Sequence, residues 1–470
     1  MRKASLCILV ACLRPLAAAV FDGRVLEDHN GNPLPRVEIR VTRPNATGIV
    51  VELETDSQGR FRTPDLPDAE YLVRFSKTNF STIELTTPPR SGIGMRLVHF
   101  GAISGRVFQF DGQPALNVSK DSVMALTSSG VKAGTTDRNS PPGEYRIYGL
   151  LPGRYRITIT ENTGEGGRVR HGVFFHPNNS QPREFWISGG EDNSNADFTL
   201  PAGAAYTVSG KVDPRTPARA ILAVVSADLP WLSLGIAAAR PDGRFSIPDL
   251  LPGNYELLTS AGSGDAIAFG RVPAAVTAGN VEGVTLTVDQ TRSATLTLRA
   301  QEGCASSVAV DLTATEAWFS PIPVSATMQT EKPANLAHLA PSRYALAAKV
   351  LQGNCYAVAP PFLDLTRDSI AKPVEVVLVP PGSIRGQLTG ARRPADYLAV
   401  LIASDGSQQI AFPDDQGQFV FPRLRPGAYF VIAAGPGTPW IPPENRIPPP
   451  VEVTPGAPTQ LDLRVAAVSR

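Results

Sequence analysis

The stretch PDGRFSIPDLLPGNYEL, residues 241–257, decides the fold. A turn at Gly243 leads into residues 245–247, where apolar and polar side chains alternate with the period of a half-buried β-strand. The Leu-Pro-Gly that follows forms a second turn, because proline fixes φ and cannot donate a hydrogen bond to a sheet. Tyr255 then begins another strand. The stretch therefore predicts two strands joined by a proline-glycine turn.

The same pattern recurs along the chain: an aromatic residue stands two positions after a glycine, a leucine seven after it and a tyrosine twelve after it. The four complete copies are Gly59 with Tyr71, Gly143 with Tyr155, Gly243 with Tyr255, and Gly417 with Tyr429. A fifth copy keeps Leu339, Pro341 and Tyr344 but lacks the turn glycines. Repetition in fixed register indicates tandem units. We interpret the five tyrosines as structural, with the ring packed inward and the hydroxyl bonded to the turn backbone.

Each unit also has an opening strand ahead of its turn. The five openings are Gly23-Arg24-Val25, Gly105-Arg106-Val107, Gly210-Lys211-Val212, Leu296-Thr297-Leu298 and Gly386-Gln387-Leu388. Because no helical periodicity of useful length appears, the sequence predicts an all-β chain of about five small β-sandwich domains. The expected domains are residues 20–99, 100–203, 204–291, 292–380 and 381–470.

The opening, the Asp-x-x-Gly-x-Phe turn and the Leu-x-Pro-Gly-x-Tyr turn together resemble the carboxypeptidase regulatory-like domain. The resemblance covers nearly all of the mature chain, although the fourth unit departs from it at the turn glycines. It implies a seven-stranded sandwich of the transthyretin type in each unit. The phrase Val173-Phe174-Phe175-His176-Pro177 resembles long exported bacterial proteins built from such domains. Because the fold is shared with starch-binding modules, the resemblance also implies carbohydrate binding, by analogy alone.

The N-terminus has the pattern of an export signal. Arg2 and Lys3 precede the apolar run 6–13, and residues 17–19 are alanines suited to cleavage. We therefore expect a signal peptide over residues 1–19 and an exported protein that is periplasmic, outer-membrane-associated or extracellular. Residues 9–12 also resemble a bacterial lipoprotein box, which would place a lipid on Cys12.

Only two cysteines lie outside the signal, Cys304 and Cys355. A single pair in an exported chain predicts one disulfide in the fourth domain. Closing a loop of about 50 residues would stabilise that domain by about 4 kcal/mol in the chain-entropy model. The alternative is a pair of buried free thiols.

The charge of the chain is balanced, with 44 basic and 43 acidic residues. Nucleic-acid binding proteins usually carry a basic excess, because phosphate neutralisation dominates their affinity, so we expect no nucleic-acid partner. No stretch after the signal reaches the roughly 18 consecutive apolar residues of a transmembrane helix. We therefore expect no membrane span after the signal segment.

No catalytic centre is recognisable in the sequence. The five histidines are dispersed and match no zinc-binding signature; they are His29, His99, His171, His176 and His338. No Gly-x-Ser-x-Gly and no phosphate-binding loop is present either. We predict a protein that is not an enzyme and has no cofactor and no metal.

The first functional hypothesis is polysaccharide binding at the cell surface or in the periplasm. It rests on the fold analogy and on aromatic rings in loop-like contexts, since flat rings stack on sugar faces. The candidates for stacking are Trp440, between prolines, and then Trp231 and Trp318. Packing at the edge of a sandwich is the alternative interpretation for each ring.

The second hypothesis is a structural spacer or protein-interaction scaffold of the cell envelope. Serial sandwiches can join cell-envelope proteins through their edge strands. Five units with short linkers would then form an elongated particle.

Overall fold

The computed structural model describes residues 18–465 except 45–47, 129, 164–168, 214–219, 263–266, 289–290, 305–306, 317, 320–323, 331, 352, 371, 395–396, 404–407 and 436–447. The predicted signal peptide up to residue 17, with Cys12, lies outside these residues. The described part holds strands and one short 3-10 helix, η1 (Lys120–Ser122), but no α-helix. It therefore contains no helix able to cross a membrane. The predicted all-β fold is confirmed.

Sandwich 1 shows the topology on which the chain is built. A four-stranded sheet in the order β4-β3-β7-β8 packs on a three-stranded sheet in the order β5-β2-β9, where β2 and β9 run parallel. Two residues near the N-terminus, β1, pair with β6. The strands are β1 (Ala18–Ala19), β2 (Asp22–Glu27), β3 (Glu38–Thr42), β4 (Ile49–Glu54), β5 (Arg60–Arg62), β6 (Leu66–Pro67), β7 (Tyr71–Ser76), β8 (Ile83–Thr87) and β9 (Ile93–Leu97).

Sandwiches 3 and 5 repeat this topology strand for strand. In sandwich 3 the sheet β22-β21-β24-β25 packs on β23-β20-β26, and in sandwich 5 the sheet β37-β36-β39-β40 packs on β38-β35-β41. The strands of sandwich 3 are β20 (Tyr206–Asp213), β21 (Ile221–Ser226), β22 (Ser233–Ala238), β23 (Arg244–Leu250), β24 (Gly253–Ala261), β25 (Ala268–Val276) and β26 (Val281–Thr287). Those of sandwich 5 are β35 (Gly382–Thr389), β36 (Leu398–Ala403), β37 (Gln408–Ala411), β38 (Gln418–Leu424), β39 (Gly427–Ala434), β40 (Val451–Val453) and β41 (Pro458–Arg464).

Sandwich 2 is a longer version of the same fold. Its last strand is replaced by two short pieces, β18 and β19, that both run parallel to β10, and both β16 and β17 pair with β15. The strands are β10 (Gly101–Phe108), β11 (Val123–Thr127), β12 (Lys132–Ala133), β13 (Thr135–Thr136), β14 (Glu144–Leu150), β15 (Gly153–Thr163), β16 (Val169–Phe175), β17 (Glu184–Ile187), β18 (Asp192–Asn193) and β19 (Phe198–Thr199).

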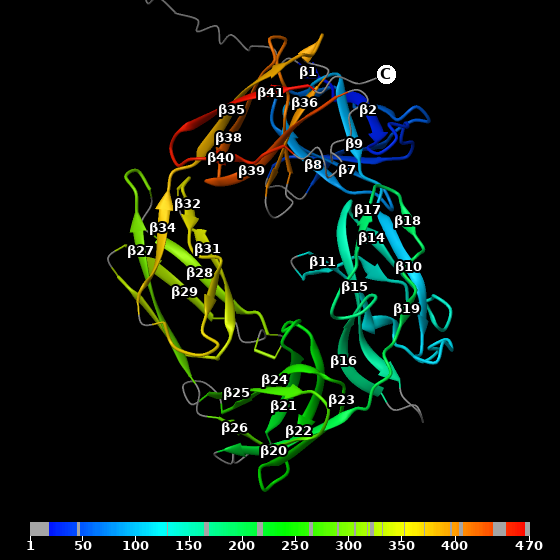
Figure 1. The fold of residues 1–470 in the computed structure, drawn as a ribbon. Coiled ribbons are helices and arrows are strands. Elements are labelled where there is room, and N and C mark those ends of the chain that lie inside the picture. Colours follow the sequence, from blue (N-terminus) through cyan, green and yellow to red (C-terminus); the bar gives the residue numbers. More distant parts are fainter. Residues whose placement is uncertain are drawn as a thin grey trace, which may run out of the picture.

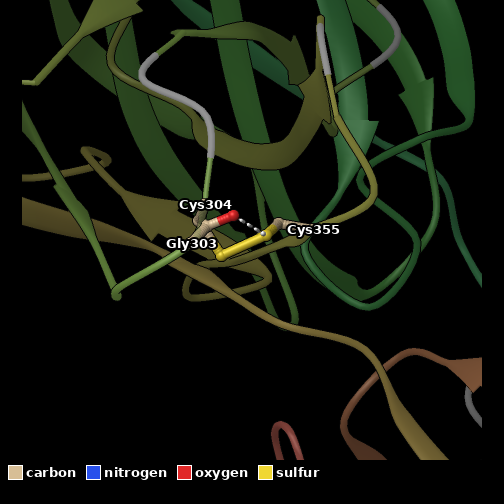
Figure 2. Close-up of a disulfide and its surroundings, with 3 residues drawn as sticks. All are labelled: Gly303, Cys304 and Cys355. Atoms are coloured by element: carbon tan, nitrogen blue, oxygen red, sulfur yellow. Dashed lines mark hydrogen bonds between the residues drawn. A yellow bond between two sulfur atoms is a disulfide. The ribbon is translucent and has the colours of Figure 1, made fainter.

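Sandwich 4 has two four-stranded sheets, β30-β27-β34-β32 and β29-β28-β31-β33. The predicted disulfide is confirmed: Cys304 and Cys355 are bonded, with their Cα atoms 5.7 Å apart, beside the carbonyl of Gly303 (Figure 2). The strands are β27 (Arg292–Ala300), β28 (Ser307–Ala314), β29 (Val324–Gln329), β30 (Ala334–Leu339), β31 (Arg343–Val350), β32 (Tyr356–Val358), β33 (Phe362–Asp364) and β34 (Val374–Val379).

The turn glycine of the repeat is needed for the close approach of two strands. Gly59 has a φ of 71°, and its carbonyl accepts a hydrogen bond from the amide of Val25 at 2.8 Å. A Cβ at position 59 would lie 2.4 Å from the carbonyl oxygen of Val25. The same bond joins Gly143 to Val107, Gly243 to Val212, and Gly417 to Leu388. The glycine therefore ties the turn to the opening strand of its own sandwich.

The repeated tyrosines are buried at the start of a strand. Four of them donate a hydrogen bond from the hydroxyl to the carbonyl four residues upstream: Tyr155 to Leu151, Tyr255 to Leu251, Tyr344 to Ala340 and Tyr429 to Arg425. Tyr71 is the exception, because its buried hydroxyl has no partner among the described residues. Its turn reads Asp-Ala-Glu where most of the other copies read Pro-Gly.

The five sandwiches follow one another around a closed circle, in which sandwich 5 lies beside sandwich 1 (Figure 1). Each sandwich contacts the next one around the circle. The amide of Gly190 donates to the carbonyl of His99 between sandwiches 2 and 1, β16 pairs with β23 between sandwiches 2 and 3, and Arg271 forms an ion pair with Glu316 between sandwiches 3 and 4. Arg425 donates to the carbonyl of Ala357 between sandwiches 5 and 4, and Arg96 donates to the carbonyl of Gly435 between sandwiches 1 and 5. The expectation of an elongated particle, which followed from the spacer hypothesis, is therefore wrong. Apolar side chains on the outer surface of sandwich 5 pack against sandwich 1 and close the chain on itself.

Candidate functional site

A polar cleft of about 690 Å³ lies on sandwich 2, over strands β10 and β14. Its floor comes from the two strands, and its walls come from the loops 137–141 and 194–197. The lining side chains are those of Ser104, Arg106, Asp137, Asn139, Ser140, Glu144, Arg146, Asn195 and Asp197, among others. Most of these side chains carry a charge or a hydrogen-bonding group, so the cleft suits a polar ligand.

One ion pair holds the 194–197 wall of the cleft on its floor, and a second pair joins the floor to β18 beside it. Arg106 Nη2 lies 2.8 Å from Asp197 Oδ2, and the Arg106 amide donates to Asp197 Oδ1 at 2.8 Å. Arg146 Nη2 lies 2.7 Å from Asp192 Oδ2, on β18. Because each guanidinium comes from a strand and each carboxylate from the segment after β17, the cleft is preorganised by contacts within sandwich 2.

The bond between Arg106 and Asp197 also shifts the pKa values of both partners. The hydrogen bond from the Arg106 guanidinium lowers the pKa of Asp197, against the opposing effect of partial burial. The bond to Asp197 raises the pKa of Arg106 in turn. Both shifts move away from neutral pH, so the pair remains ionised there. It is suited to positioning and hydrogen bonding and not to proton transfer.

Tyr145 lies under the cleft and points into the core. Its hydroxyl donates to the carbonyl of Ala196, which attaches the 194–197 loop to the sheet. Burial raises the pKa of this phenol far above its ordinary value. Tyr145 therefore supports the cleft and is not available as an acid or base at neutral pH.

An exposed aromatic ring stands at the end of the same row of side chains. Glu144, Arg146 and Tyr148 share one face of β14, because alternate residues of a strand point the same way. Tyr148 is 43% exposed. Beside the cleft it offers a flat ring together with hydrogen-bonding groups.

Sandwich 3 has a smaller cleft of about 430 Å³ in the corresponding place, over β20 and β23. Its charged lining residues are Lys211, Arg240, Arg244 and Glu282. A third hollow of about 280 Å³ lies where sandwiches 2 and 3 meet, and is lined mainly by apolar residues that include Phe174, Phe198 and Leu251. The cleft of sandwich 2 is thus the larger and more polar of these sites.

The tryptophans expected to stack on sugars lie elsewhere. Trp231 sits between sandwiches 2 and 3, where its ring packs near Met124 and Leu126 and its indole donates to the carbonyl of Gly130. Trp318 packs against the core of sandwich 4. Trp440 falls outside the described residues. Neither described ring is near the polar cleft.

The histidines are not gathered into a site. His176 is buried, and one ring nitrogen lies 2.9 Å from the carbonyl of Asp197, while burial lowers its pKa. The carbonyl of His171 accepts a hydrogen bond from the Leu251 amide at the junction with sandwich 3. Over the described ranges, no three His, Cys, Asp or Glu residues are grouped to hold a metal.

Sequence reasoning missed the residues of the polar cleft. Arg106 belongs to a recognised opening strand, but its partner Asp197 lies 91 residues later in the chain. The sequence signal for this site is that residues 161–195 of the second unit form an extra segment rich in glycine and asparagine. The structure shows that the end of this segment forms one wall of the cleft.

Structures similar to this chain include a Bacillus anthracis protein and two streptococcal pilins. The Bacillus anthracis TIE protein is 9% identical, with 84% of this chain and 71% of that chain covered and a TM-score of 0.18. A streptococcal ancillary pilin is 11% identical, covering 56% and 100%, with a TM-score of 0.23. A minor pilin of Streptococcus agalactiae is 14% identical, covering 40% and 98%, with a TM-score of 0.23.

No curated protein sequence matches the chain. The model of the carboxypeptidase regulatory-like domain family matches residues 21–92. This range holds six of the seven strands of the two packed sheets of sandwich 1 and ends directly before the seventh, β9. In sequence, the first sandwich is therefore similar to the carboxypeptidase regulatory-like domain family.

Proposed function

We propose that this chain is a non-catalytic, exported binding protein in which a closed circle of sandwiches presents the polar cleft of sandwich 2 to a polysaccharide. The observation that supports it best is the cleft itself. Its Arg106–Asp197 pair remains ionised at neutral pH, and Asn139 and Asn195 are exposed at its rim. The disulfide in sandwich 4 agrees with an oxidising compartment.

The charge of the cleft narrows the class of ligand. Arg106 and Arg146 are each matched by an aspartate, so the site has no surplus of positive charge for a phosphate or a nucleic acid. Sugar hydroxyls both donate and accept hydrogen bonds, which suits amide, hydroxyl and carboxylate side chains in one place. Tyr148 adds an aromatic face on which a sugar ring can stack.

The test is a binding experiment on the full mature chain. Retention on insoluble neutral and acidic polysaccharides is measured for the unsubstituted chain, for Tyr148→Ala and for Asn195→Ala. We expect each substitution to weaken retention at least several-fold. Phe362→Ala is the matched control, because Phe362 is also 43% exposed but lies on sandwich 4.

Two results contradict the proposal. One is the absence of retention on every polysaccharide tested. The other is retention that Tyr148→Ala and Asn195→Ala leave equal to that of the Phe362→Ala control, since the ligand would then bind outside the cleft.

A second candidate function is a scaffold that joins cell-envelope proteins through a sheet edge. The observation in its favour is β22, the outermost strand of its sheet, where Ile236 is 71% exposed. An edge strand with an exposed apolar residue can accept a strand from a partner. Ile236→Lys should then abolish capture of envelope proteins without changing polysaccharide retention, whereas Tyr148→Ala should do the reverse.

A further inference from the structure

The sandwiches are joined to one another unequally. Buried apolar clusters are shared by sandwiches 2 and 3, by sandwiches 3 and 4, and by sandwiches 5 and 1. Among the described residues, no such cluster spans sandwiches 1 and 2 or sandwiches 4 and 5. Sandwich 5 is therefore packed more extensively on sandwich 1, almost 300 residues away in the chain, than on sandwich 4, which precedes it directly.

The surface of sandwich 5 that contacts sandwich 1 is built by its four-stranded sheet. Strand β36 is apolar on both faces: Ala399 and Leu401 belong to the core of sandwich 5, while Leu398 and Val400 belong to the core cluster of sandwich 1. Ile432 and Ala434 of β39 join the same cluster. These four outward side chains are each at least nine-tenths buried. A sheet face this apolar needs a partner.

Polar contacts at the rim orient the interface. The Arg90 guanidinium lies 3.7 Å from the ring centroid of Phe412, and Arg96 Nη2 lies 3.5 Å from the carbonyl of Gly435. Both arginines belong to sandwich 1. Burial lowers the pKa of Arg90 and of Arg96, as expected for cations partly removed from water.

The junction between sandwiches 4 and 5 is small by comparison. Tyr356 donates to the carbonyl of Arg423, and Arg425 donates to the carbonyl of Ala357. Strand β34 ends at Val379 and β35 begins at Gly382, so two prolines form the whole connection. The chain connection is thus separate from the interface that holds sandwich 5 in place.

We propose that the outer face of the β37-β36-β39-β40 sheet is a docking surface for sandwich 1 that is complete without the connection at Pro380-Pro381, and that it accepts sandwich 1 of a second copy of this chain as well as its own. The contacts are identical in the two cases. Exchange of an identical element between copies is a low-cost route to oligomers, because no new interface has to be formed. Within one copy the connection raises the effective concentration, so the closed circle is favoured in dilute solution.

The experiment uses the full mature chain with a protease site inserted between Pro380 and Pro381. After cleavage of the folded protein, sandwich 5 should still co-elute with residues 20–380 in size-exclusion chromatography. Val400→Asp should release it, because a carboxylate would be buried in the apolar interface. Val420→Asp is the matched control, since Val420 lies on β38 of the same sandwich and is half exposed.

The second-copy claim is tested with two cleavable copies. One copy carries a tag at its C-terminus and the other carries a different tag before sandwich 1. The copies are mixed, cleaved and left to equilibrate, and the second tag is captured. The tagged sandwich 5 of the first copy should be recovered with the second copy, but not when the first copy carries Val400→Asp.

If Val400→Asp prevents folding of sandwich 5, Phe412→Ala serves instead, because it removes only the ring under Arg90 and should weaken retention several-fold. Loss of sandwich 5 from the cleaved, unsubstituted protein would overturn the proposal. Retention within each copy without any exchange between tagged copies would overturn the second-copy claim. Neither outcome depends on whether sandwich 2 binds a polysaccharide.

Discussion

Gly386 of β35 pairs directly with Phe419 of β38, and the ring of Phe419 fills the space that a side chain at position 386 would need. A Cβ there would lie 2.0 Å from Cζ of the ring. The same glycine–aromatic pairing occurs in sandwiches 1, 2 and 3. Sandwich 4 reverses the sizes: Leu296 stands at the glycine position and pairs with Ala334 at the aromatic position. The pair thus keeps one large and one small member.

This relationship predicts the effect of Gly386→Ala. The added methyl group collides with the ring, so we expect overpacking to destabilise sandwich 5 by about 1–3 kcal/mol. The double substitution Gly386→Leu with Phe419→Ala copies the arrangement of sandwich 4. It should be less destabilising than the sum of its two single substitutions, because the leucine fills the space left by the ring. Hydrogen exchange of the β35 and β38 amides measures both effects, and simple additivity would contradict the size-exchange explanation.

The tyrosine hydroxyls predict a contrast between two conservative substitutions. Tyr155→Phe removes the donor to the Leu151 carbonyl, a bond of 2.7 Å, and should cost about 1 kcal/mol. Tyr71→Phe removes a buried hydroxyl that has no partner within the described chain, and should be neutral or stabilising. Urea denaturation of the two variants measures the difference. Equal destabilisation by both would show that the turn bond is not what the repeated tyrosine contributes.

The disulfide predicts a local loss of stability on reduction. It closes a loop with a sequence separation of 51, so removing it should destabilise sandwich 4 by about 4 kcal/mol in the chain-entropy model. The double variant Cys304→Ser with Cys355→Ser should show faster hydrogen exchange in β28 and β31. Strands of sandwich 2, which shares no buried cluster with sandwich 4 within the described ranges, serve as the internal control and should exchange at unchanged rates.

Buried tyrosines predict sensitivity to alkali. Burial raises the pKa of Tyr344 to about 12 and also raises the pKa values of Tyr145, Tyr155 and Tyr255. A pKa raised in the folded state means that the protonated form is favoured by folding. The stabilisation is complete below the unfolded pKa of about 10 and is lost as pH rises through the folded values. Stability should therefore fall steeply above about pH 10, with the phenolate absorbance of these four buried tyrosines appearing together with unfolding. Their contribution is the part of the absorbance that is lost when each is replaced by phenylalanine, and its appearance before unfolding would contradict this prediction.

The repeat made the fold predictable from sequence, because each of its residues acts locally. Within one segment of the chain, a turn is specified by Gly243, an inward ring by Phe245 and a second turn by Tyr255. The structure shows a positive φ at Gly243, a buried ring at Phe245 and a hydrogen bond from the Tyr255 hydroxyl to the turn backbone. The polar cleft was not predictable in this way. It depends on pairs such as Arg146 with Asp192, which are 46 residues apart and are brought together only by the parallel pairing of β18 with β10.

The circular arrangement did leave a signal in the sequence, although the elongated shape was expected. A strand covered on one face alternates, as β3 does with Glu38, Arg40 and Thr42 facing outward. The run Leu398–Ala403 does not alternate and reads Leu-Ala-Val-Leu-Ile-Ala. An uninterrupted apolar run indicates a strand buried on both faces. Such a run therefore identifies the sandwiches whose outer sheet face is covered by a neighbour.

The position of these doubly covered strands has a consequence for biosynthesis. The outer face of β11 is covered by sandwich 3 and that of β21 by sandwich 4, in each case by the part of the chain made next. The outer face of β36 is made after these two and is covered by sandwich 1, which precedes them in the chain. Each apolar sheet face is therefore buried against a neighbouring sandwich soon after it leaves the ribosome or the export channel. Domains fold as units during synthesis, so the final surface meets a receptor that has already folded, and the order of the sandwiches itself limits aggregation.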